Sequence, residues 1–198
     1  MLPYLPFLLF CFASTLTPGP NNILLMSSGM NFGIRRSLPF YFGVCLGFSL
    51  LVLVIGLGLG AVFLHFPVLH LVIKIAGVLY LLYLAFKIAT SHKAIQRQEK
   101  KSPLRFFQGA LLQWLNIKVW IVAITAVSTY TKNNGHLFEQ AALISTFFLL
   151  VALFSAGCWL FSGAALTRFL TSAKHRVYFN YLLAALLLLS IFLLFVPE

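Results

Sequence analysis

Long apolar runs, separated by short polar or basic segments, fill almost the whole chain. A helix needs about 20 apolar residues to cross a bilayer, and the pattern predicts six such helices. Their expected ranges are 4–29, 38–64, 67–90, 106–130, 138–165 and 177–196. We therefore expect an all-α, polytopic membrane protein with no separate soluble domain.

The first apolar run is interrupted by the sequence Thr17-Pro18-Gly19-Pro20-Asn21-Asn22. Proline lacks a backbone N–H and clashes with the preceding turn, so two prolines and a glycine cannot continue a helix. Inside a membrane the freed backbone groups need protein or a water-filled cavity to satisfy them. A simple kink is the alternative, but the two asparagines that follow are good caps for a new half-helix. The pattern predicts a first helix broken at Pro18-Gly19-Pro20, with a binding site built on the break.

Polar residues also interrupt the fourth run, at Gln113, Asn116 and Lys118. Counted from Leu104 at about 1.5 Å per residue, Asn116 lies about 18 Å along a helix, near the middle of the bilayer. A charged side chain at that depth costs about 2.5–3.5 kcal/mol on insertion scales, so Lys118 should face a partner or a wet cavity. No acidic residue of this chain lies at the middle of a span, because there are only Glu99, Glu139 and Glu198. A substrate carboxylate would supply the missing charge.

Composition agrees with this pattern. The 198 residues are 61% hydrophobic and 9% charged, with a mean hydropathy of +0.99, whereas soluble domains carry about 25% charged residues. The net charge of +11 would suggest nucleic acid in a soluble protein. Here no nucleic-acid partner is expected, because the basic residues gather in short loops without interleaved aromatics. The lipid bilayer is the expected surrounding.

The expected orientation follows from the basic residues. Loops one, three and five hold ten of them, whereas Lys132 stands alone in loop four. Positive loops favour the cytoplasm, so both termini are expected outside. The ten are Arg35, Arg36, Lys93, Arg97, Lys100, Lys101, Arg105, Arg168, Lys174 and Arg176.

Two halves of three spans each, residues 1–90 and 104–198, are joined by the basic cytoplasmic loop 91–105. Because three is odd, the second half is inverted relative to the first, and the whole chain forms one transmembrane transporter domain. The broken first span and the polar fourth span then open corresponding halves, a recurring plan of secondary transporters. Small residues in span two should bring helices close together, and such faces serve internal packing or a homo-oligomer contact equally. They are Gly43, Gly47, Gly56, Gly58 and Gly60.

Spans five and six offer no candidate site, and Ser155, Gly157 and Cys158 are expected to pack. The other cysteines, Cys11 and Cys45, also lie in apolar runs without paired spacing. This placement predicts that the cysteines are small packing residues and do not form a disulfide, a metal site or a redox pair. No cofactor, metal or catalytic residue is expected.

With these features the sequence resembles the LysE/RhtB family of amino-acid exporters over essentially its whole length. The resemblance rests on the Thr17–Asn22 motif, the basic third loop and the polar centre of span four. Many family members have Asn-Pro-Lys in span four, whereas this chain has Asn116-Ile117-Lys118, which leaves open whether span four is broken. This form, with Ala126-Val127-Ser128-Thr129 and Cys158-Trp159, looks most like the cysteine/O-acetylserine exporter subgroup.

The resemblance implies an exporter in the bacterial inner membrane that discharges small amino acids or their derivatives, driven by the proton motive force. In our hypothesis, Lys118 and the half-helix start near Asn21 hold the substrate carboxylate. Amide and hydroxyl groups bond its other polar groups, and carbonyls freed by the break meet its ammonium. The expected substrate-binding residues are Thr17, Pro18, Gly19, Pro20, Asn21, Asn22, Gln113, Asn116 and Lys118.

Other classes stay open. An assembly subunit would use the break as a kink and pair Lys118 with a partner's acid. A membrane-embedded thiol-redox or acyl-transfer enzyme is less favoured, because the chain lacks a close cysteine pair and a nucleophile beside a histidine or carboxylate. Cysteine, O-acetylserine, homoserine and threonine are all open as substrates. The proton carrier is open too, with Lys118, His65 and His70 as candidates.

Overall fold

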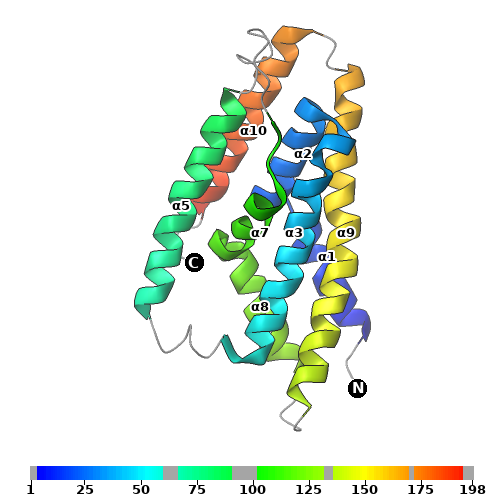
Figure 1. Ribbon diagram of the computed structural model, residues 1–198, viewed down its shortest axis with the longest axis vertical. Helices are drawn as coiled ribbons and strands as arrows, with labels where there is room; N and C mark the ends of the chain where they lie inside the picture. Colours follow the sequence, from blue (N-terminus) through cyan, green and yellow to red (C-terminus); the bar gives the residue numbers. More distant parts are fainter. Residues whose placement is uncertain (1–3, 60–66, 91–101, 132–135, 170–171, 194–198) are drawn as a thin grey trace.

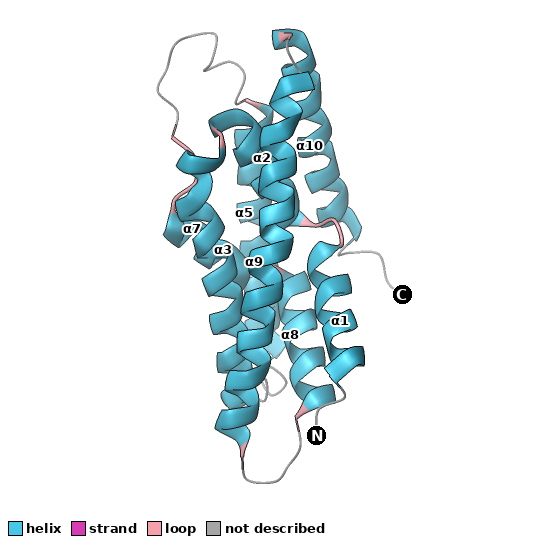
Figure 2. Ribbon diagram, turned by 90° about the vertical axis from the view of Figure 1, so that its right-hand side faces the viewer, coloured by secondary structure: helices cyan, strands magenta, loops and turns pink. Residues whose placement is uncertain are grey.

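The computed structural model describes an elongated bundle in which every regular element of the described ranges is a helix (Figures 1 and 2). The described residues are 4–59, 67–90, 102–131, 136–169 and 172–193. The helices are α1 (Tyr4–Leu16), α2 (Pro20–Phe32), α3 (Ile34–Val54) with a π-helical turn (Ile55–Leu59), α5 (Pro67–Ala89), α7 (Phe106–Leu115), α8 (Ile117–Tyr130), α9 (Leu137–Phe169) and α10 (Ala173–Leu193).

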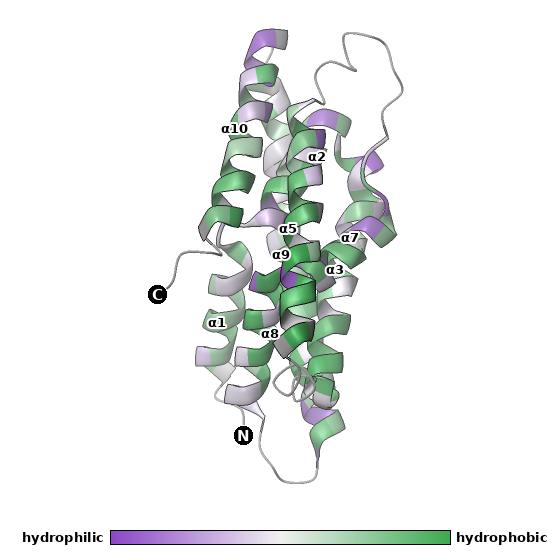
Figure 3. Ribbon diagram, turned by 90° about the vertical axis from the view of Figure 1, so that its left-hand side faces the viewer, coloured by the Kyte–Doolittle hydropathy of each residue, from purple (hydrophilic) through white to green (hydrophobic). Residues whose placement is uncertain are grey.

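Several of these helices are long and apolar enough to cross a membrane. Four do so by length and composition in the described ranges: Ile34–Leu59, Leu71–Ala89, Leu137–Thr167 and Lys174–Phe192. The bent pair α7 and α8 makes a fifth if it is one span. Hydrophobic colours run along most of the bundle in Figure 3. The predicted all-α membrane fold is confirmed at this level.

The predicted interruption of the first helix is present, because α1 ends at Leu16 and α2 begins at Pro20. The prediction that the asparagines cap the new helix is wrong: Gly19 is the N-cap, and Pro20 is the first helical residue. Proline suits that position because its missing N–H would have no intrahelical partner there, and its fixed φ angle already fits the helix. Asn21 and Asn22 therefore lie inside the first turn of α2.

The fourth span is also broken, which settles the question that the missing proline left open. The axes of α7 and α8 differ by 69° at Asn116. This residue has extended backbone angles (φ −99°, ψ 103°), and its side-chain oxygen accepts a hydrogen bond from the Lys118 backbone N–H at 3.2 Å. Asparagine therefore ends α7 and caps α8 without a proline, as its short side chain does at many helix starts.

Most of the basic residues expected in loops lie instead at helix ends. Gly33, with a φ of +75°, joins α2 to α3 alone, so no loop is needed there. A glycine adopts this backbone conformation without steric cost. Arg35 and Arg36 occupy the first turn of α3, Arg168 lies in α9, Lys174 and Arg176 in α10, and Arg105 is the N-cap of α7. Lys93, Arg97, Lys100, Lys101 and Lys132 are outside the described residues, as is His65, and the His70 side chain is not described either.

Each broken span packs against the long helix of the other half. Both α1 and α2 contact α9, whereas α7 and α8 contact α3. The long helices α3 and α9 also contact one another, and α5 pairs with α10 at the side of the bundle (Figure 1). This arrangement brings the two breaks toward each other in the middle.

Helix α2 and helix α9 touch backbone to backbone. A Cβ built at Gly29 would collide with the carbonyl oxygen of Leu160, and one built at Gly163 would collide with that of Met26. We call this contact the α2–α9 glycine seam. Only glycine allows two helices to approach so closely at these positions.

Three of the five glycines predicted to serve packing in span two do so. Their closest neighbours are Phe106 for Gly43, Ala110 for Gly47 and Ala141 for Gly56. Gly58 has a different role, because its φ of +117° is a conformation that favours glycine and nothing lies within 4 Å of its Cβ position. Gly60 is outside the described residues. Of the cysteines, Cys11 and Cys45 are buried as expected, whereas Cys158 is exposed.

Candidate functional site

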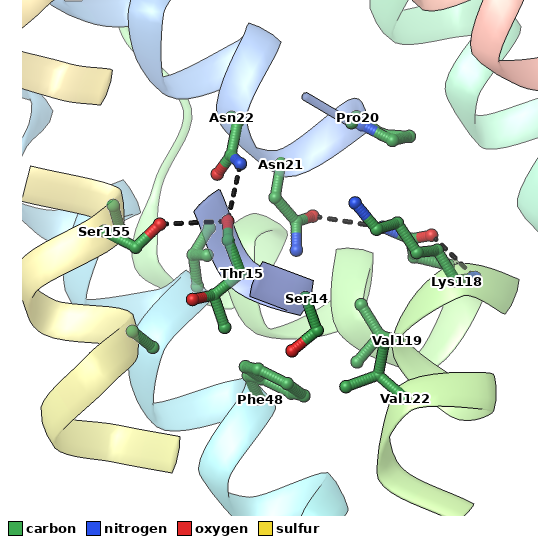
Figure 4. Close-up of a pocket in the computed structure, with 15 residues that line it drawn as sticks. Ser14, Thr15, Pro20, Asn21, Asn22, Phe48, Lys118, Val119, Val122 and Ser155 are labelled. Carbon is green, nitrogen blue, oxygen red and sulfur yellow. Dashed lines mark hydrogen bonds between the residues drawn. The ribbon is translucent and has the colours of Figure 1, made fainter. Parts of the chain in front are cut away.

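A pocket of about 490 Å³, open solvent included, lies where the two breaks meet. Its lining comes from α1, α2, α3, α8 and α9, together with the residues of the breaks (Figure 4). We call it the central pocket. Six of the nine predicted site residues line it: Gly19, Pro20, Asn21, Asn22, Asn116 and Lys118. Among the described residues, Thr17, Pro18 and Gln113 are not part of the lining.

The carbonyls released at the end of α1 are hydrogen-bonded by side chains from three elements. The Thr15 carbonyl accepts from Asn22 Nδ2 at 2.8 Å and from Ser155 Oγ at 2.9 Å (Figure 4). The Thr17 carbonyl accepts from Asn22 Nδ2 at 3.0 Å and from Lys118 Nζ at 3.2 Å. The hypothesis that these carbonyls await a substrate ammonium therefore needs correction: the protein's own donors already occupy them.

The start of α2 presents the opposite polarity. No side chain caps it, and its first intrahelical backbone bond runs from Ile23 N–H to the Gly19 carbonyl at 3.0 Å. The backbone N–H groups of Asn21 and Asn22 lie before that bond, at the positive end of the helix dipole. Both residues line the central pocket, so this end of α2 suits an anionic ligand.

Lys118 brings a positive charge to the same place. Its ammonium bonds the Thr17 carbonyl at 3.2 Å, at the negative end of the α1 dipole. A Cβ built at Gly19 would lie 3.2 Å from Lys118 Nζ and 3.4 Å from its Cδ. The absence of a side chain at Gly19 therefore leaves room for the lysine to cross the break.

A cluster of amides connects the two breaks. Asn21 Nδ2 donates to Gln113 Oε1 at 2.7 Å, and Asn116 Nδ2 donates to Asn21 Oδ1 at 3.3 Å. Gln113 also donates to the Gly109 carbonyl at 2.9 Å and is fully buried. Buried amides of this kind need such partners. Gln113 was predicted to bond the substrate; in this structure it lies outside the lining of the central pocket and its side chain bonds Asn21.

Thr17 was also predicted to bond the substrate through its hydroxyl. The residue is exposed and directly follows α1, and its hydroxyl donates to the carbonyl of Ala13, a residue of α1. Thr17 does not line the central pocket, but its carbonyl accepts hydrogen bonds from two residues that do, Asn22 and Lys118.

The opposite wall of the central pocket is mainly apolar, and the sequence did not reveal it. Phe48 comes from α3, Val119 and Val122 from α8, and Ala152 and Ala156 from α9 (Figure 4). Ser155, expected only to pack, lines the pocket and bonds Thr15. Its spacing from Ala152 and Ala156 places three small residues on one helical face, which was the available signal. Nothing in the sequence of α3 indicated that Phe48 lines the pocket.

The chemistry of the pocket is that of a binding site with one charged and one apolar side. Within the described ranges, no group of three or more His, Cys, Asp and Glu side chains lies close enough to hold a metal ion. The available groups are an ammonium, amides, hydroxyls and the start of a helix, which bind and orient a small anionic or zwitterionic molecule.

Comparisons with known proteins agree on one family. The model of the LysE type translocator family matches residues 12–196. A cysteine/O-acetylserine efflux protein of Salmonella typhimurium is 33% identical over 151 residues, which are 76% of each chain. The protein of that name from Escherichia coli K12 is 30% identical over 175 residues, which are 88% of each chain. No solved structure matches the chain.

Proposed function

This chain belongs to the LysE type translocator family, and we propose that it exports small amino acids or their derivatives, of the cysteine and O-acetylserine kind, from the bacterial cytoplasm. The observation that carries the proposal is the central pocket, in which two helix breaks converge around the Lys118 ammonium and two amide side chains. The efflux proteins of Salmonella and Escherichia support the substrate class by their similarity.

The proposal includes six membrane crossings, with α1 and α2 counted as one and α7 and α8 as another. The basic residues support a common cytoplasmic end, because they stand near the start of α3, the end of α5, the N-cap of α7 and the start of α10. The start of α3, the end of α5 and the start of α10 lie at the upper end of the bundle in Figure 1. The upper end would face the cytoplasm of the inner membrane, and both termini would face the periplasm.

The substrate carboxylate would bind between Lys118 Nζ and the first backbone N–H groups of α2. Both are positive and both reach the central pocket. Asn116 and Asn22 would bond other polar groups, and the apolar wall with Phe48 would receive a short side chain. Lys118 would have to exchange its hydrogen bond to the Thr17 carbonyl for one to the substrate carboxylate. This exchange keeps the net free energy of substrate binding small.

Transport would follow alternating access around this pocket, with the proton motive force as the energy source. The packing of each broken span against the long helix of the other half supports this, because secondary transporters built from inverted halves hold their site between broken helices near the midplane and open it in turn to each side.

The test is uptake of labelled small amino acids into energised inside-out vesicles, or their efflux from preloaded cells, with wild type and Lys118→Ala, with and without a protonophore. Wild type should export selectively, and the protonophore should stop it. Losing a charge-assisted hydrogen bond costs about 1.5–3 kcal/mol, so Lys118→Ala should weaken apparent affinity on the order of 10- to 100-fold. Lys74→Ala, on α5 and away from the central pocket, is the matched control.

Two results would contradict the proposal. Full transport by a well-expressed Lys118→Ala variant would remove the lysine from the site. No export of any amino acid by folded wild-type protein would reject the exporter itself.

A further inference from the structure

A second pocket, of about 390 Å³ with open solvent included, lies between α2, α5 and the segment that precedes α7. Its polar lining consists of Ser27, Ser28 and Lys87, and the rest is apolar, including Leu24 and Leu104. We call it the entrance pocket. It shares no lining residue with the central pocket.

One face of α2 connects the two pockets. Asn21, Leu24 and Ser28 follow each other at helical spacings of three and four residues, so they share a face. Asn21 lines the central pocket, and Leu24 lines the entrance pocket. Along the helix axis these two residues are about 4.5 Å apart, or three residues at 1.5 Å each. Asn21 Nδ2 also donates a 2.7 Å hydrogen bond to Oε1 of the buried Gln113 of α7.

The entrance pocket lies at the basic end of the bundle. Lys87 is in the last turn of α5, and Leu104 directly precedes Arg105, the N-cap of α7. Arg35 and Arg36 follow the end of α2. A molecule entering from that end meets a positive surrounding before it reaches Asn21.

Two serine hydroxyls are buried in this apolar setting. Ser28 shares a 2.7 Å hydrogen bond with Ser37, and Ser27 Oγ accepts from Asn31 Nδ2 at 3.2 Å. Because Ser27 Oγ is the acceptor in that bond, its hydroxyl can donate to a ligand oxygen. Polar groups inside membrane helices are costly and commonly mark a substrate pathway.

We propose that the entrance pocket is a cytoplasmic subsite for the exported amino acid, in which Lys87 holds the carboxylate and Ser27 donates a hydrogen bond to it. The proposal rests on the proposed export function. An amino acid bound there would pass to the central pocket when Asn21 and Gln113 separate, one helical turn further along α2. A headgroup phosphate offers a similar anion, so the test has to distinguish it from a free amino acid.

The first experiment measures access and charge. Cys11, Cys45 and Cys158 are replaced by alanine, Ser27→Cys is added, and inside-out vesicles are treated with impermeant thiol reagents, one anionic and one cationic. We expect labelling from the cytoplasmic face, faster with the anionic reagent, and slowed by O-acetylserine, which has no thiol. In Lys87→Gln the preference for the anionic reagent should fall several-fold, whereas Lys87→Arg and the control Lys74→Gln should retain it.

The second experiment measures transport in the native-cysteine protein. Lys87→Gln should raise KM for amino acid on the cytoplasmic side about tenfold and leave kcat within twofold, and Lys87→Arg should restore most of the affinity. Varying the anionic lipid content of the vesicles should leave the KM difference unchanged if the ligand is the free amino acid.

Four outcomes would overturn the subsite: labelling only from the periplasmic face, a reagent preference unchanged in Lys87→Gln, a KM unaltered in Lys87→Gln, or a KM difference that disappears without anionic lipid. Export by wild type with an unaltered KM in Lys87→Gln would reject the subsite and leave the exporter standing. Absence of export by wild type would instead reject the proposed function.

Discussion

Lys118 and Gly19 together set the charge and the space at the centre of the pocket. The lysine contributes the positive charge, and the glycine leaves the room through which its side chain reaches the Thr17 carbonyl. The backbone of Gly19 is extended, with φ near 180°, a conformation open to any residue. The requirement for glycine is therefore one of space at the lysine and not one of backbone strain.

Gly19→Ala should consequently impair transport more than stability. The new methyl would lie 3.2 Å from Lys118 Nζ, so the ammonium would have to shift by a few tenths of an ångström from its position at the Thr17 carbonyl. We expect apparent substrate affinity to fall several-fold in the efflux assay, with a melting temperature within a few degrees of wild type. Gly157→Ala is the matched control, because the nearest atoms to its Cβ lie at 3.8–4.0 Å. Equal effects of both substitutions on transport would contradict this role of Gly19.

Residues of the candidate site that interrupt an apolar run could be predicted from the sequence. Residues of the site that lie within an apolar run could not. The motif from Thr17 to Asn22 and the polar centre at Asn116 and Lys118 stand out because they are costly in a membrane. Ser155 did not stand out, since a serine among small residues is also ordinary packing. Gln113 was predicted as a substrate contact, whereas in the structure its side chain bonds Asn21, because sequence does not tell which face of α7 meets α2.

At the scale of elements, both breaks follow one rule: the freed carbonyls are bonded by nearby donors. At the end of α1 these donors are Asn22, Ser155 and Lys118. At the end of α7, Trp120 Nε1 donates to the Trp114 carbonyl at 2.9 Å. A helix interrupted among apolar neighbours is stable only with such substitutes.

The α2–α9 glycine seam should be more sensitive to size than other glycine positions. Gly163→Ala would drive a methyl into the Met26 carbonyl, a backbone atom that cannot rotate away. Overpacking of this kind costs about 1–3 kcal/mol, so the melting temperature in detergent should fall by several degrees. Gly157→Ala, measured in parallel, should stay near wild type. An unchanged melting temperature in Gly163→Ala would mean that the two helices are not held this close.

Helix ranges were predicted from hydropathy to within a few residues in most cases, because long apolar runs leave few alternatives. The tight junction at Gly33 was not foreseen: a single residue at positive φ replaced an expected loop and drew Arg35 and Arg36 into α3. The break at Asn116 was likewise beyond the pattern, since asparagine does not by itself exclude a helix.

For the whole molecule, an inverted arrangement of the two halves was predicted because each half has an odd number of spans. The residues of the two halves are not similar enough to predict it. The structure shows a further feature that the number of spans does not predict: each broken span lies against the long helix of the other half. The two halves are therefore interleaved, and neither encloses the central pocket by itself.

The proposed orientation is tested with reporters fused to different sites. Alkaline phosphatase, which is active only in the periplasm, should be active when fused after Glu198. It should be inactive when fused within residues 91–101, the segment that follows α5 in the sequence, where a cytoplasmic fluorescent reporter should be bright. The opposite pattern would invert the orientation, and equal activity at both sites would contradict an odd number of crossings between them.

The hydrogen bond between Lys118 and Thr17 has a consequence for the transport cycle. In the proposed cycle the site must reorient without its amino acid after release, and an ammonium without a partner among apolar helices would make that step slow. Bound to the carbonyl at the end of α1, the lysine carries its own resting partner. The exchange of the substrate carboxylate for the Thr17 carbonyl at Lys118 would then accompany both the release of the amino acid and the reorientation without it.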